Sequence, residues 1–123
     1  MSNLNLPHLS FDSLSRRLGN KTSGTLGYAT TVHRLSTAIT ISHHGNTIAV
    51  LTPMSLGISN AGHSSATTRT RLNKILRDNG VPFGVGQKNW EQILFDRSDD
   101  TSQPFTGSAQ FLRADNDSEW ALV

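Results

Sequence analysis

Residues 64–80 read SSATTRTRLNKILRDNG and carry the clearest local signal for secondary structure in the chain. It opens with hydroxyl side chains, which are preferred at helix N-termini, and it closes with a basic turn followed by Gly80. Three apolar residues recur at helical spacing and form one stripe: Leu72, Ile75 and Leu76. We therefore predict a helix of about three turns from Thr68 to Asn79, with Thr67 or Thr68 as its N-cap.

Around this helix the sequence alternates between apolar and polar side chains, as strands do. The run from Thr31 to Ser42 alternates throughout, and Thr47 to Leu51 resumes the pattern after turn residues 43–46, which predicts a hairpin. Further strands are expected at 56–59, 83–87 and 90–95. A short helix is expected from Ser10 to Leu18. The predicted fold is α+β, an antiparallel sheet of about five strands with the main helix packed on one face.

Residues 96–123 lack this periodicity. They are rich in Ser, Asp, Gln and Gly, a composition typical of irregular, solvated segments. We therefore predict a single α+β domain over residues 1–95 and an acidic, loop-like C-terminal tail over 96–123. Deleting the tail is expected to leave the body folded and to raise its affinity for anions. Unfolding of the truncated chain would instead indicate that Phe105, Phe111 or Trp120 completes the core.

The charge of the chain is divided unevenly. Residues 1–95 carry nine Lys or Arg and three acids, a net charge of +6, whereas residues 96–123 carry two Arg and six acids, a net charge of −4. A basic body suits nucleic acid or another anionic ligand, and ordinary surface charge with a solubilising tail is the alternative. The chain has no cysteine, which excludes disulfides, cysteine-bound zinc and thiol nucleophiles. Together with the lack of a signal-peptide pattern, this favours a reducing cytosol.

The start of the predicted helix has the composition of an anion site. Hydroxyls, guanidinium groups and the unpaired backbone N–H groups of a first helical turn are expected to converge there. The residues predicted to form the site are Thr67, Thr68, Arg69, Arg71, Asn73 and His63. A capped surface helix whose long cations cover the edge of the core is the alternative. Arg69 and Arg71 are expected on the two flanks of the apolar stripe, where their removal would leave the melting temperature nearly unchanged.

Catalytic and metal chemistry find little support in the sequence. Asp78 and Glu91 are the only carboxylates from residue 13 to residue 95, so carboxylate pairs and Ser-His-Asp triads lack their acids. His43 and His44 are adjacent and would point to opposite faces of a strand, which disfavours a shared metal ion. The glycine pattern of dinucleotide-binding proteins is incomplete. We therefore predict no enzymatic activity, no cofactor and no metal.

Several short stretches carry a resemblance to known proteins. They are LGNKT at 18–22, HGNTIA at 44–49, AGH at 61–63 and ATTRTRLN at 66–73. Through them the chain resembles, from about Leu18 to Ile93, a family of small proteins encoded by tailed bacteriophages and related prophages, with TTRxRLN as the core motif. His63 departs from the family, in which an aromatic residue is common at that position. The resemblance implies a phage origin and an accessory role in the host cytoplasm, and it implies no particular activity.

The sequence thus predicts a phage-type accessory protein that binds a phosphate-bearing partner without catalysis, with nucleic acid favoured. Trp90 and Phe83 could stack on a base, and packing in the core is the alternative for both. Two other functions stay open. One is a counter-defence protein that sequesters a nucleotide signal or inhibits a host protein, and the other is a virion or assembly component. No membrane partner is expected, and a homo-oligomer is left open.

Overall fold

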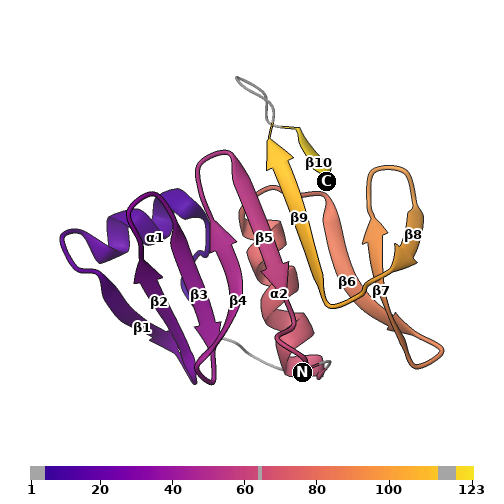
Figure 1. The fold of residues 1–123 in the computed structure, drawn as a ribbon, viewed down its shortest axis with the longest axis horizontal. Coiled ribbons are helices and arrows are strands. Elements are labelled where there is room, and N and C mark those ends of the chain that lie inside the picture. Colours follow the sequence, from indigo (N-terminus) through magenta and orange to yellow (C-terminus); the bar gives the residue numbers. More distant parts are fainter. Residues whose placement is uncertain (1–4, 64, 114–118) are drawn as a thin grey trace.

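The computed structural model describes residues 5–63, 65–113 and 119–123. Within these residues the chain forms two helices and two antiparallel sheets (Figure 1). The helices are α1 (Phe11–Leu18) and α2 (Ala66–Asp78). The larger sheet has the spatial order β1 (Ser23–Gly27), β2 (Thr30–Arg34), β3 (Ile39–His43), β4 (Asn46–Leu51), β5 (Ser55–Ser59), β9 (Ser108–Arg113) and β10 (Trp120–Leu122). The smaller sheet has the order β6 (Phe83–Lys88), β7 (Glu91–Asp96) and β8 (Thr101–Pro104).

The core lies between the helices and one face of the larger sheet. Both helices are behind that sheet in Figure 1, with α1 near β3 and α2 near β4. Leu72, Ile75 and Leu76 of α2 are fully buried, as their helical spacing predicts. The opposite face of the sheet is open, since Val50 on β4 is 41% exposed. The predicted α+β class is therefore confirmed, as is the helical stripe that packs on the sheet.

The predicted number of strands is wrong. The run from Thr31 to Ser42 is two strands rather than one, because β2 and β3 are separated by a turn in which the amide of Leu35 donates to the carbonyl of Ala38 at 2.8 Å. Leu35 keeps the alternation of the sequence although it is 56% exposed. The apolar and polar pattern thus continues through a turn that reverses the chain.

The C-terminal segment is not the irregular tail that its composition predicts. Strand β9 lies between β5 and β10, and its pairing with β5 runs from Ser55 opposite Leu112 to Ser59 opposite Ser108. Phe111 on β9 is fully buried, and Phe105 is buried ahead of it. The ladder and the buried rings make this segment part of the larger sheet and its core. Residues 114–118, which carry part of the predicted acidity, lie outside the described residues.

The ends of α2 are fixed by polar side chains. Its N-cap is Ser65, whose hydroxyl accepts from the amide of Thr68 at 3.3 Å, so the prediction of Thr67 or Thr68 as the cap is wrong. At the other end the carboxylate of Asp78 accepts from the backbone amide of Leu9 at 2.9 Å. The side-chain amide of Asn79 donates to the backbone carbonyl of Leu9 at 3.1 Å. The C-terminus of α2 therefore holds the segment that leads into α1.

Neither helix in the described part of the chain is long and apolar enough to cross a membrane.

Candidate functional site

A hollow of about 570 Å³ lies where the turn between β3 and β4 meets the start of α2. Its lining residues are His43, His44, Asn46, Gly62, His63, Ser65, Thr67 and Thr68. Each of these residues is neutral or basic. The hollow therefore combines imidazoles and hydroxyls with the N-terminus of a helix, where backbone N–H groups lack intrahelical acceptors.

The hairpin turn determines how its two histidines are placed. His43 continues the inward alternation of Ile39 and Ile41 on β3 and is 93% buried, with 7% of its surface exposed. His44 and Gly45 both have positive φ values, 52° and 80°, as a two-residue turn of this type requires. His44 is consequently exposed at the rim, while His43 forms part of the floor.

His43 has an unusual polar environment. Its Nδ1 atom is buried and has no hydrogen-bond partner among the described residues. Burial, reinforced by the positive charge of Arg71, lowers the pKa of His43 below its ordinary value of 6.5. At neutral pH the imidazole is therefore uncharged, and its Nδ1 has no partner within the described part of the chain.

Arg71 is buried beside the hollow rather than solvated on the flank of α2. Its Nε donates to the hydroxyl of Thr30 at 2.9 Å, and its two terminal nitrogens donate to the carbonyls of Tyr28 and Thr67, each at 3.2 Å. In the described part of the chain no carboxylate pairs with this guanidinium. Burial lowers the pKa of Arg71, but a guanidinium stays charged in proteins. Among the described residues this buried positive charge therefore has no carboxylate as a counter-ion.

The remaining two predicted residues point to the smaller sheet. The side chain of Asn73 donates to the carbonyl of Val85 at 2.9 Å and accepts from its amide at 2.7 Å, which ties α2 to β6. Arg69 donates to the side chain of Gln92 on β7 at 3.4 Å. Of the six predicted residues, the structure places His63, Thr67 and Thr68 in the hollow and Arg71 beside it, whereas Arg69 and Asn73 lie outside it.

Sequence reasoning did not assign His43 and His44 to this hollow. The burial of His43 could have been read from its alternation with Ile39 and Ile41. Its proximity to α2 could not, because β4 and β5 lie between His43 and the helix in the sequence. Among the described residues no group of three or more His, Cys, Asp or Glu side chains is placed to hold a metal ion.

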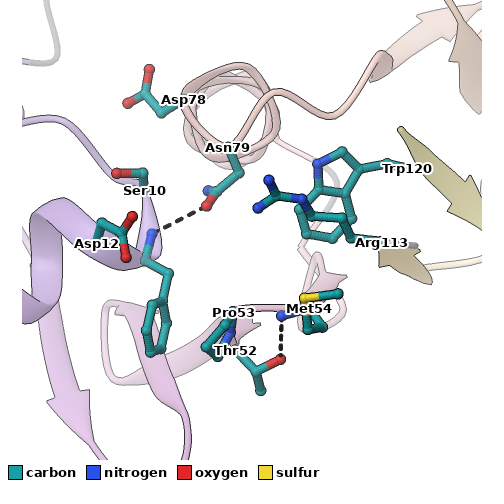
Figure 2. A pocket seen from close by; sticks show the side chains of 10 residues that line it. Ser10, Asp12, Thr52, Pro53, Met54, Asp78, Asn79, Arg113 and Trp120 are labelled. Carbon is teal, nitrogen blue, oxygen red and sulfur yellow. Dashed lines mark hydrogen bonds between the residues drawn. The ribbon is translucent and has the colours of Figure 1, made fainter. Parts of the chain in front are cut away.

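A second hollow, of about 460 Å³, offers a less distinct chemistry (Figure 2). Asp12 on α1 and Arg113 on β9 lie on opposite sides of it, so its charge is mixed. Asn79 between them already accepts from the amide of Phe11 at 3.2 Å. The side chain of Asn79 thus helps to pack α1 against α2. The hollow at the start of α2 is therefore the stronger candidate for a binding site.

Comparisons with known proteins agree with the resemblance noted in the sequence. The model of the family described as Kyanoviridae Gp96 protein matches residues 18–112, which is most of the chain. No curated protein and no solved structure matches the chain. The match includes β1 to β8, α2 and nearly all of β9. The chain therefore belongs to the Kyanoviridae Gp96 protein family, a family of phage-encoded proteins.

Proposed function

We propose that this phage protein binds a phosphate group of its partner in the hollow at the start of α2, without catalysis, and that the partner is a nucleic acid. In this proposal the protein acts as an accessory factor in the host cytoplasm. The partner's phosphate sits against the first turn of α2, between the exposed His63 and the hydroxyl of Thr67.

The observation that carries the proposal is the buried, unpaired charge of Arg71. Buried charges in proteins are nearly always paired, because taking an ion out of water is costly. Arg71 has only neutral oxygens as partners in the described chain, and the neighbouring His43 leaves Nδ1 without a partner. A bound anion would compensate the charge of Arg71.

The helix itself adds to this preference for an anion. Ser65 satisfies the amide of Thr68, whereas the amides of Ala66 and Thr67 begin the helix, where no intrahelical acceptor exists. The positive end of the helix dipole also faces the hollow. Arg69 and Arg71 follow in the first two turns of α2, and the first turn holds no acid, so the start of the helix favours an anion over a small neutral ligand.

Thr67→Glu is expected to weaken binding of a short oligonucleotide by roughly tenfold or more, the effect of losing one charge-assisted hydrogen bond. The new carboxylate would occupy the hollow and repel the phosphate. An acid in the first turn favours a helix, so the variant should stay folded, and an unchanged melting temperature would show this. Fluorescence anisotropy at about 50 and 200 mM salt measures the affinity.

Thr37→Glu is the matched control, because it makes the same charge change at an exposed position in the turn between β2 and β3, far from the hollow. It is expected to leave the affinity close to that of the wild type. Equal losses in the two variants would show that only overall charge matters and would contradict a phosphate site at α2.

The size of the hollow favours one second candidate. A volume of about 570 Å³ is typical of sites for small molecules, so a free nucleotide could fill it, as sequestration of a nucleotide signal requires. A mononucleotide that binds more tightly than an oligonucleotide would favour this second function.

A further inference from the structure

We infer that the partner is an unpaired nucleic-acid strand whose bases stack on Tyr28 and Trp90, at the two ends of a row that has the phosphate hollow in its middle. This inference rests on the proposed function and specifies its ligand. It is drawn from the position of the two most exposed aromatic side chains in the described structure, which are 78% and 91% exposed.

Tyr28 contacts a residue that lines the hollow. It lies in the turn between β1 and β2, and its ring contacts that of His44 edge to face, with the ring centres 5.8 Å apart. Its carbonyl accepts from Arg71 at 3.2 Å, which fixes the backbone of the turn to the buried guanidinium. One face of an aromatic ring is thus presented to solvent next to the proposed phosphate position.

Trp90 occupies a position where the fold itself would favour glycine. It is the second residue of the two-residue turn between β6 and β7, with φ of 68°, and it follows Asn89 with φ of 52°. Turns of this type prefer Asn-Gly, because L side chains rarely adopt these angles. Packing does not account for the tryptophan, since 91% of its surface is exposed. An indole that is both strained and exposed is explained by a partner that covers it.

The two aromatics and the hollow share one edge of the molecule. The turns after β1, β3 and β6 and the start of α2 all lie at the lower edge in Figure 1. The hollow joins the β3 to β4 turn to α2, and Arg69 joins the first turns of α2 to Gln92, two residues beyond Trp90. The order along the edge is therefore Tyr28, the hollow, Arg69 and Trp90.

This arrangement suits a single strand better than a duplex. Proteins that bind single strands combine basic groups that follow the backbone with aromatic rings on which bases stack, and duplex bases are not free to stack in this way. Arg69 supplies a basic group between the hollow and the β6 to β7 hairpin, and the buried Arg71 adds its positive charge beside the hollow. The one acid next to the β6 to β7 turn, Glu91, lies opposite Lys88 in the register of the hairpin.

The test uses the full chain, a thymidine oligonucleotide of about 12 nucleotides and an abasic oligonucleotide of the same length and charge. Trp90→Gly and Tyr28→Ala are each expected to weaken binding of the thymidine strand about 5- to 100-fold, the usual effect of losing one stacked base. Neither variant should change binding of the abasic strand. Trp90→Gly should at the same time keep or raise the melting temperature, because it gives the turn its preferred residue.

Leu35→Ala is the control, since Leu35 is an exposed apolar residue in the turn between β2 and β3, at the opposite edge. Equal affinity of the wild type for the thymidine and abasic strands would overturn the inference and leave the phosphate site intact. Unchanged thymidine binding in both aromatic variants would also overturn it, and would indicate that these rings meet a protein instead. If the wild-type protein bound neither the thymidine strand nor the abasic strand, the proposed function itself would fail.

Discussion

Phe111→Ala is expected to lower the free energy of unfolding by about 3–5 kcal/mol. Phe111 lies on β9 and is fully buried, with its ring centre 5.0 Å from that of Phe83 on β6. Removing the ring would leave a cavity between the larger and the smaller sheet. The loss is a large part of the stability of a typical domain, so the variant should show a much lower urea midpoint.

Leu112→Ala is the control for this change. Leu112 is the next residue on the same strand but is 52% exposed, so its truncation should cost less than about 1 kcal/mol. If the two variants had equal stability, β9 would not be part of the core, and the C-terminal segment would be the dispensable tail that its composition suggests. Deletion of residues 97–123 should likewise unfold the chain, contrary to the expectation from sequence.

Leu72→Ala is expected to cost about 2–5 kcal/mol. Leu72 is fully buried on the apolar stripe of α2, at the centre of the interface between the helix and the sheet. Because α2 also carries the first turn that lines the hollow, the variant should lose ligand affinity only as it unfolds. The comparison is Arg77→Ala on the exposed side of the same helix, which should change stability by less than about 0.5 kcal/mol. A small loss for Leu72→Ala would place α2 on the surface and contradict this architecture.

The elements with a strong local pattern could be predicted from the sequence. The stripe of α2 and the hairpin of β3 and β4 combine periodicity with turn or capping residues, and both are present. The break between β2 and β3 could not be predicted, because Leu35 and Thr37 keep the strand pattern through the turn. Strand β9 escaped detection for a different reason. Its partner β5 is about 50 residues away in the chain, and Phe111 is its only fully buried residue.

The candidate site was predictable in part. His63, Thr67 and Thr68 were identified because they are close together in the sequence around the start of a helix. A helical wheel places Arg69 and Arg71 on two equivalent flanks, but it does not show what covers each flank. The β1 to β2 turn covers Arg71 and buries it, whereas the smaller sheet meets Arg69. The role of Arg71 as an unpaired buried charge therefore became visible only with the tertiary structure.

A titration of isotope-labelled protein with pyrophosphate, followed by the backbone amide signals in NMR, tests whether the hollow at the start of α2 binds phosphate. If the hollow at the start of α2 binds phosphate, the signals of Thr67, Thr68 and His43 should shift together and saturate, and Thr67→Glu should abolish the shifts. Shifts that do not saturate, or that are as large at the exposed Arg16 and Arg17 of α1 as in the hollow, would contradict the claim.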